Sequence, residues 1–179
     1  NTMASAIEAL GMSLPGAASN LAVDEGNEIS VDKRDDCARA AQAVIALLQS
    51  GLKARDIMTR KAFENAIKTL AAIGGSTNAV IHLIAMAGRI GLKLTVDDFD
   101  RLGSELPCLV NLQSSGKYLM EDFCYAGGLP AVMKEISGHL HLDALTVTGK
   151  SIRDNIAGAE NFNQDVIKPL SQPFMEKAG

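Results

Sequence analysis

IGGSTNAVIH (residues 73–82) carries the strongest local signals in the sequence, because it joins a glycine pair to the start of an apolar helix. The glycines favour a tight turn, and three short polar residues then precede an apolar run with helical spacing. The first turn of a helix leaves backbone N–H groups without partners and carries the positive end of the helix dipole. The stretch therefore predicts either an ordinary helix cap after a turn, which the spacing favours, or a seat for a carboxylate or phosphate group. The candidate binding residues are Gly74, Gly75, Ser76, Thr77 and Asn78.

Further helices are predicted on both sides of this stretch, and several of them end at a glycine. The long helix over 33–50 is expected to begin after Asp32 as its cap, and Thr95 with Asp98 forms a capping-box pattern. Pro130 is placed to open a further helix in its first turn. The other helices are predicted over residues 2–10, 60–73, 77–90, 96–103, 118–126 and 150–158, and the inward positions of the helix over 77–90 are Val80, Ile81, Leu83, Ile84 and Ala87.

Two short apolar runs are predicted as buried strands. They are LPCLVNL at 106–112, which is followed by a turn, and LTVTG at 145–149. Short apolar strands that alternate with helices are typical of domains in which helices cover a parallel sheet. We therefore expect an α/β fold, a layered α/β/α segment that is rich in helix and contains short, buried, parallel strands.

The composition is that of a globular protein and excludes several classes. Of the 179 residues, 47% are hydrophobic and 21% are charged, and the net charge is −4. The scattered basic residues form no patch for nucleic acid, and no apolar run reaches the roughly 18–20 residues of a membrane span. Cys37, Cys108 and Cys124 are widely spaced, which is typical of thiols in a reducing compartment. We expect a cytoplasmic protein with no nucleic-acid or membrane partner.

Two further motifs resemble a phosphate-binding loop and a metal site, but each has a simpler structural explanation. TVTGKS (146–151) lacks the first glycine of a phosphate-binding loop, because that position holds Ala144, and Thr148 as a helix cap explains the stretch better. His139 and His141 would share one face of a strand, but no third metal ligand lies nearby in the sequence. We interpret the two histidines as a surface or interface pair.

Six stretches follow one another along the chain: NTMASAIEALGMSLPG, GGSTNAVIHLIAMA, LTVDDFDRL, SGKYLMEDFCYAGGLPAVMKE, LTVTGKSIRDN and NQDVIKPL. In this order they resemble the dihydroxy-acid and sugar-acid dehydratases (the IlvD/Edd family) over essentially the whole chain. The resemblance implies a hydro-lyase that dehydrates a 2,3-dihydroxy acid to a 2-keto acid. YLMEDFCYAGGLPAVM resembles more closely the members that act on sugar acids such as pentonates. The alternative substrate is the branched dihydroxy acid of branched-chain amino-acid synthesis.

The resemblance also implies an iron–sulfur cluster, 2Fe-2S or 4Fe-4S, and Mg²⁺ in the full-length protein. In the family, the cluster cysteines, the Mg²⁺ ligands and the serine thought to act as base lie outside the segment matched here. No catalytic residue or metal ligand is therefore expected in this chain, and its three cysteines are not assigned to the cluster. The family's third cluster cysteine lies a few residues before the motif that includes Asn1 and Thr2, so we expect these two residues near the cluster. The resemblance also strengthens the anion-seat interpretation of residues 74–78.

The resemblance divides the chain and suggests its assembly. Residues 1–170 correspond to the second half of an N-terminal α/β domain, and the proline-containing residues 171–179 are interpreted as a linker toward a C-terminal domain. A small hydroxy acid is the expected substrate, and the full-length protein is expected to form a homodimer or homotetramer. The alternative of another class is a non-catalytic scaffold or assembly segment, since the apolar faces of 33–50 and 77–90 need cover. The segment alone is expected to be inactive.

Overall fold

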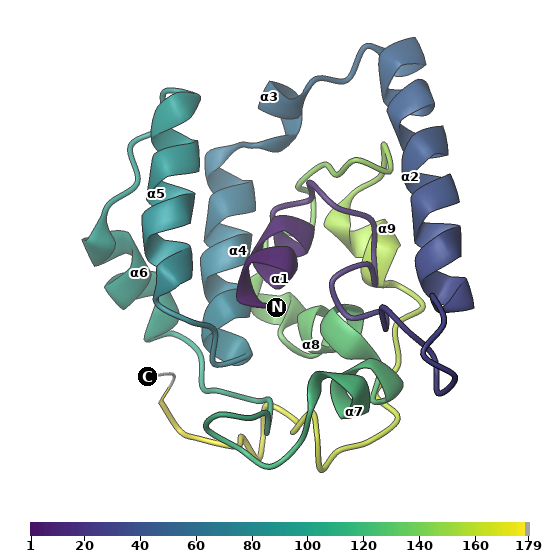
Figure 1. The fold of residues 1–179 in the computed structure, drawn as a ribbon. Helices are drawn as coiled ribbons and strands as arrows, with labels where there is room; N and C mark the ends of the chain where they lie inside the picture. Colours follow the sequence, from purple (N-terminus) through teal and green to yellow (C-terminus); the bar gives the residue numbers. More distant parts are fainter. Residues whose placement is uncertain (178–179) are drawn as a thin grey trace.

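The computed structural model describes residues 1–177, and most of its regular structure is helical (Figure 1). The expected linker over 171–179 extends into residues 178–179, which lie outside the described residues. The helices in chain order are α1 (Thr2–Ala9), α2 (Val31–Ser50), α3 (Ala54–Ile57), α4 (Arg60–Ala72), α5 (Asn78–Arg89), α6 (Val96–Gly103), α7 (Met120–Tyr125), α8 (Gly128–Glu135), the 3-10 helix η1 (Ser137–His139) and α9 (Ile152–Ile156).

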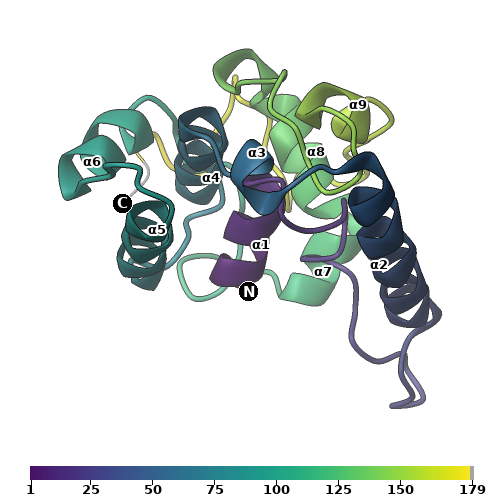
Figure 2. The ribbon, with the colours of Figure 1, turned by 90° about the horizontal axis from the view of Figure 1, so that it is seen from above.

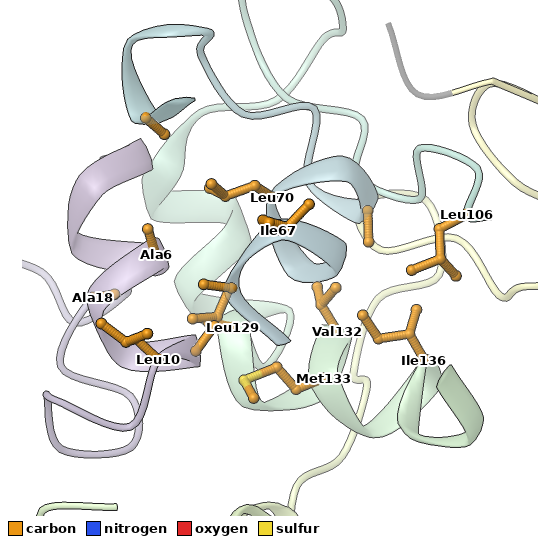
Figure 3. Packing of buried hydrophobic residues seen from close by; sticks show 14 of the residues in the cluster. Ala6, Leu10, Ala18, Ile67, Leu70, Leu106, Leu129, Val132, Met133 and Ile136 are labelled. Atoms are coloured by element: carbon orange, nitrogen blue, oxygen red, sulfur yellow. The ribbon is translucent and has the colours of Figure 1, made fainter. Parts of the chain in front are cut away.

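The core is built around α4, which packs against α1, α6 and α8. Figure 3 shows Ile67 and Leu70 of α4 near Leu129 and Val132 of α8, with Ala6 of α1 beside them. Small alanine side chains on α1 allow its backbone to approach α4 closely. Each large apolar side chain that is buried in this way contributes about 1.5–3 kcal/mol to the free energy of folding. The helix that the sequence pattern predicts over 60–73 is thus present and packed in the core.

The β structure is smaller than predicted, and most of its pairing is antiparallel. Residues 106–112 are extended and largely buried, as expected. Within residues 1–177, however, they form only single bridges: Cys108 with Met175 and Val110 with Ile167 are antiparallel, and Leu112 with Tyr118 is parallel. The segment after α9 returns along 108–110 in the opposite direction, which a prediction of alternating strands and helices does not anticipate. The α/β prediction is therefore confirmed for its helix-rich character and only in part for its layers.

The second predicted strand is a closed turn. In LTVTG (145–149), Leu145 forms an antiparallel bridge with Ser151, only six residues later. Val147 N–H donates to the carbonyl oxygen of Gly11 at 2.8 Å, which ties this turn to the end of α1. The expected parallel strand at this place is wrong.

The start of α2 differs from its prediction by two residues. Ser30 is the cap, because its Oγ accepts a hydrogen bond from Lys33 N–H at 3.1 Å. Asp32, the predicted cap, lies in the first turn of the helix, where a carboxylate complements the helix dipole. The helix itself and its end at Gly51 agree with the sequence pattern.

Two helices expose apolar residues, and in α5 one of them is a residue that the sequence pattern placed inward. In α5, Leu83 and Ala87 are buried as predicted, but Ile81 is 69% exposed. Residues two positions apart on a helix point about 200° apart, so Ile81 cannot share the face of Leu83. In α2, Val44 and Leu48 are 55% and 74% exposed.

None of the helices in the described part of the chain is long and apolar enough to cross a membrane.

Candidate functional site

A cleft of about 480 Å³ lies between the start of α1, the loop that joins α4 to α5, and the extended segment after residue 107. It brings together both groups of residues that the sequence singled out, the first two residues and the loop over 74–77. Asn78, the first residue of α5, is the one predicted residue that does not line it. The lining residues are Asn1, Thr2, Ser5, Ile73, Gly74, Gly75, Ser76, Thr77, Cys108, Val110, Leu112, Gln113, Ser114, Ser115, Met120 and Phe123.

The glycine pair forms this wall because it ends α4. Gly74 N–H donates to the carbonyl oxygen of Ala71 at 3.1 Å, and Gly75 N–H donates to that of Leu70 at 2.8 Å. Gly74 has a φ of +64°, a left-handed conformation that glycine adopts without the strain of a side chain. A Cβ on Gly74 would lie 3.1 Å from Cys108 Sγ. The missing side chain therefore allows the loop to contact the opposite wall of the cleft.

The loop is tied to α1 by a single hydroxyl group. Ser76 N–H donates to Thr2 Oγ1 at 3.1 Å, and Asn78 N–H donates to Ser76 Oγ at 3.3 Å. Two N–H groups that an anion could have used are thus bonded within the protein, and Thr77, the residue before α5, makes no side-chain cap hydrogen bond. The side chains of Ser76 and Thr77 are exposed along the cleft. The loop can still offer hydroxyl groups to a polar ligand.

The opposite wall is a turn held by Asn111. Its Oδ1 accepts from Lys117 N–H at 2.8 Å, and its carbonyl oxygen accepts from Tyr118 N–H at 3.0 Å. The turn places Ser114 and Ser115 along the cleft. The Lys117 ammonium lies 5.0 Å from the centre of the Tyr118 ring, and Lys117 is not among the lining residues. This wall therefore presents hydroxyl groups.

Cys108 forms part of the cleft wall below this turn. The residue is buried, its Sγ lies 3.7 Å from the carbonyl oxygen of Val110, and burial raises the pKa of the thiol. A thiol with a raised pKa is a poor nucleophile and a poor metal ligand at neutral pH. The position suits a packed thiol.

The described residues do not offer a set of ligands for an iron–sulfur cluster or Mg²⁺. Cys37 is exposed on α2, Cys124 lies on α7, and Cys108 lies in the cleft wall. Within residues 1–177, no group of three histidine, cysteine, aspartate or glutamate side chains could hold a metal ion. Any such cofactor would need ligands from outside these residues.

The two histidines that alternate in the sequence have separate surroundings. His139 ends η1, whereas His141 Nε2 lies 2.7 Å from a carboxylate oxygen of Glu64 on α4. Asn65 of α4 also binds the main chain of His141, with its Nδ2 3.0 Å from the carbonyl oxygen and its Oδ1 2.7 Å from the N–H. The two histidines thus do not act together as the expected pair. His141 has a structural role, because its contacts fix its segment to α4.

The TVTGKS stretch is also structural. Asn155 Nδ2 donates to Thr146 Oγ1 at 2.8 Å, and Thr148 Oγ1 donates to Asn155 Oδ1 at 2.9 Å. Ser151 caps α9 by accepting from Asp154 N–H at 3.2 Å. The prediction that Thr148 caps this helix is wrong, because the helix begins after Ser151 and Thr148 braces the turn before it.

Sequence reasoning missed the far side of the cleft. Ser114, Ser115, Met120 and Phe123 were not candidates, because each lies far in sequence from the glycine loop and from the first two residues. The Ser-Ser-Gly turn was the only local signal. A Cβ on Gly116 would lie 2.3 Å from Asn111 Oδ1, so this turn requires glycine.

The chain is similar to known dehydratases, both by a family model and by individual relatives. A family model described as dihydroxy-acid/6-phosphogluconate dehydratase, N-terminal, matches residues 1–155. A dihydroxy-acid dehydratase of Methylococcus capsulatus is 50% identical over 178 residues, which cover 97% of this chain and 31% of that protein. Dihydroxy-acid dehydratase 2 of Acinetobacter baylyi is 51% identical over 97% of this chain and 30% of its own length. L-arabinonate dehydratase of Rhizobium leguminosarum bv. trifolii is 48% identical over 96% of this chain and 29% of its own length. The chain thus spans less than a third of these relatives.

Proposed function

The chain belongs to the dihydroxy-acid/6-phosphogluconate dehydratase family, and from this premise we propose that it forms one wall of the active site of a hydro-lyase. The reaction would convert a 2,3-dihydroxy acid into a 2-keto acid. The observation that carries the proposal is the cleft, because it gathers Asn1, Thr2 and the loop over 74–77 on one surface. Relatives named as dehydratases align with almost the whole chain, which supports the reaction class.

The wall supplies binding and orientation. Dehydration removes the C2 proton and expels the C3 hydroxyl group, so negative charge develops on the substrate. The side chains of Ser76 and Thr77 lie at the N-terminal end of α5, where the helix dipole favours the carboxylate of the substrate. Ser114 and Ser115 would bind hydroxyl groups from the other side. An iron–sulfur cluster and Mg²⁺ belong to this proposal only as groups held by ligands outside residues 1–177.

A sugar acid such as a pentonate is the substrate that we favour. The cleft is lined by many hydroxyl and amide side chains, which match a polyhydroxy acid better than a branched acid with methyl groups. Sequence identity does not distinguish the two substrate classes, because relatives named dihydroxy-acid dehydratase and L-arabinonate dehydratase are all 48–51% identical to the chain. The polar lining residues are Asn1, Thr2, Ser5, Ser76, Thr77, Gln113, Ser114 and Ser115.

The test is a substrate panel. The protein that carries this chain would be incubated anaerobically with Mg²⁺ and with L-arabinonate, other pentonates, a hexonate or the branched dihydroxy acid of valine synthesis, and 2-keto acid would be measured. Product from pentonates with little from the branched acid is expected. The reverse preference would overturn the substrate class, and no product from any acid would overturn the reaction. Thr77→Val should raise the KM for the preferred acid, whereas His82→Gln, on the exposed part of α5, serves as control.

We also propose a homodimer or homotetramer as the working assembly. Val44, Ile45 and Leu48 of α2 are all more than half exposed, and apolar residues grouped in this way are typical of a surface that another chain or segment covers. Light scattering of the purified protein tests the assembly. A mass that corresponds to one chain at micromolar concentration would contradict it.

A further inference from the structure

Ser5 is a buried serine of α1 whose hydroxyl group has no hydrogen-bond partner among residues 1–177. The residue is only 2% exposed, and it lines the cleft beside the loop after α4. In this part of the chain, Thr69 Oγ1 is the only fully enclosed side-chain N or O atom without a partner. Ser5 Oγ is therefore not fully enclosed, and the space that it reaches is the cleft. Buried hydroxyl groups are normally hydrogen-bonded, so a ligand in the cleft would supply the missing partner.

Thr2, the first residue of α1, presents a second hydroxyl group on the same face of the helix. Residues three apart on a helix are neighbours, and both Thr2 and Ser5 line the cleft. Thr2 Oγ1 accepts a hydrogen bond from Ser76 N–H at 3.1 Å. A hydroxyl group that accepts one bond can still donate another, and within residues 1–177 the Thr2 proton has no acceptor. The start of α1 thus offers two hydroxyl donors to the cleft.

The backbone at the start of α1 adds further donors. The first hydrogen bond of the helix runs from Ser5 N–H to the carbonyl oxygen of Asn1 at 3.0 Å, so the N–H groups of Met3 and Ala4 have no acceptor within the helix. The side chain of Asn1 does not cap them, because its Nδ2 donates to the carbonyl oxygen of Ala18 at 3.4 Å. The first turn also contains no acidic residue. No side chain of the helix therefore neutralises the positive end of its dipole.

The glycine loop has fewer donors left than the start of α1. The N–H groups of Gly74 and Gly75 are bonded to carbonyl oxygens of α4, and those of Ser76 and Asn78 are bonded to hydroxyl oxygens. The loop lies close against α1, since a Cβ on Gly75 would be 3.2 Å from Thr2 Cγ2. Figure 2 shows the start of α1, marked N, between α5 and α7. The loop therefore encloses the start of α1 from one side, while α1 supplies the free donors.

The chemistry of these donors fits an oxyanion. None of the described lining residues carries a charged side chain, so no carboxylate in the cleft wall repels an anion. Neutral donors bind an anion through hydrogen bonds, which are stronger when the acceptor is charged. We propose, on the basis of the function proposed above, that the start of α1 is the oxyanion seat of the cleft. In this seat the hydroxyl groups of Ser5 and Thr2 donate to a carboxylate or phosphate group of the substrate.

Binding of inorganic phosphate and of acetate tests the seat without turnover. Isothermal titration calorimetry would be carried out on the full-length protein that carries this chain. Ser5→Ala should weaken the binding at least about tenfold, because it removes a hydrogen bond to a charged group. Ser5→Cys keeps a side chain of similar size but a much weaker donor, and it should show a similar loss. If Ser5→Ala does not fold, Ser5→Cys still decides the question.

Ser19 provides a matched control. It is a serine that is 5% exposed and does not line the cleft, and its Oγ accepts a hydrogen bond from Leu129 N–H at 2.9 Å. Ser19→Ala should therefore lower the melting temperature and leave the affinity for phosphate unchanged. Ser5→Ala should do the opposite, because no hydrogen bond within residues 1–177 is lost with its hydroxyl group. This contrast separates a binding role from a structural one.

Two acids distinguish the sources of the oxyanion. L-arabinonate carries only a carboxylate, whereas 6-phosphogluconate also carries a phosphate group. Weaker binding of both acids to Ser5→Ala would assign the seat to the carboxylate, and weaker binding of 6-phosphogluconate alone would assign it to the phosphate.

Two outcomes would overturn the seat. The first is a wild-type protein that binds none of these anions, and the second is a Ser5→Ala variant that binds them as tightly as the wild type does. The proposed reaction can fail separately. Binding that depends on Ser5, without 2-keto acid from any substrate, would support the seat and overturn the reaction. Turnover with a KM that Ser5→Ala leaves unchanged would support the reaction and overturn the seat.

Discussion

The helices α4 and α2 show how differently two apolar helical patterns behave in one chain. In α4, nine of the 13 residues are buried, and they include the polar side chains of Asn65 and Thr69. In α2, a helix of 20 residues, the one buried residue is Asp36. The first helix is surrounded by α1, α6 and α8, whereas the second rests on a loop. Apolar residues at helical spacing predict a helix, but its burial depends on partners from elsewhere in the chain.

The largest expected difference between the helices comes from removing an apolar side chain. Phe63→Ala in α4 deletes a side chain that is 1% exposed and should lower the free energy of unfolding by about 3–5 kcal/mol. Leu48→Ala in α2 deletes one that is 74% exposed and should cost less than about 0.5 kcal/mol. Urea unfolding followed by circular dichroism measures both. Similar losses would mean that α2 is packed in solution.

A smaller difference is expected between two asparagines that hold backbone segments. Asn65→Ala removes both hydrogen bonds to the main chain of His141 and should cost about 1–3 kcal/mol. Asn20→Ala breaks one bond to Asp36 beneath α2 and should cost about 0.5–1.5 kcal/mol. The same unfolding assay compares them. A larger loss for Asn20→Ala would show that the attachment of α2 matters more to global stability than the core contact does.

The glycines that follow the two helices provide a matched pair. Gly51 after α2 and Gly74 after α4 have φ values of +72° and +64°, so alanine is strained at both. A Cβ at Gly51 meets nothing within 4 Å, whereas one at Gly74 lies 3.1 Å from Cys108 Sγ. Gly51→Ala should cost about 1 kcal/mol and Gly74→Ala about 2 kcal/mol. Thermal unfolding would show the difference, and equal losses would mean that the cleft wall adapts to the added methyl group.

The last comparison concerns the hydrogen bond that ties the loop after α4 to α1. Thr2→Val removes the oxygen that accepts from Ser76 N–H and should cost about 0.5–1.5 kcal/mol. Thr2→Ser keeps the oxygen and should restore most of this loss. Exchange of the Ser76 amide, measured by NMR, should accelerate in the valine variant alone. Equal exchange in both variants would show that the hydroxyl group does not hold the loop.

Local patterns predicted much of the helical structure. The capping box at Thr95 and Asp98 is confirmed, with Thr95 N–H donating to the carboxylate at 3.0 Å, and α4 begins where the sequence placed it. These features depend on residues within one or two turns. The glycine loop was found for the same reason, because the turn signal and the helix start are adjacent in sequence.

Features that depend on distant segments were not predictable in the same way. The bridges of Cys108 and Val110 are antiparallel because the chain after α9 returns along them, and no local pattern encodes that path. Likewise, Ser114 reaches the cleft only because the turn after residue 112 folds toward the start of α1. The exposure of Val44 could not be deduced from α2 alone. The candidate site was thus predictable in part, because the glycine loop is one continuous stretch and Asn1 and Thr2 followed from the family resemblance.

The position of α2 has a consequence for how the sequence can vary. Within residues 1–177, the main buried apolar cluster takes no side chain from α2. A library of all single substitutions should therefore find α2 more tolerant than α4, with Asp36 as the exception inside α2. Such a segment can change from one homologue to another without disturbing the core, and selection is free to shape its surface.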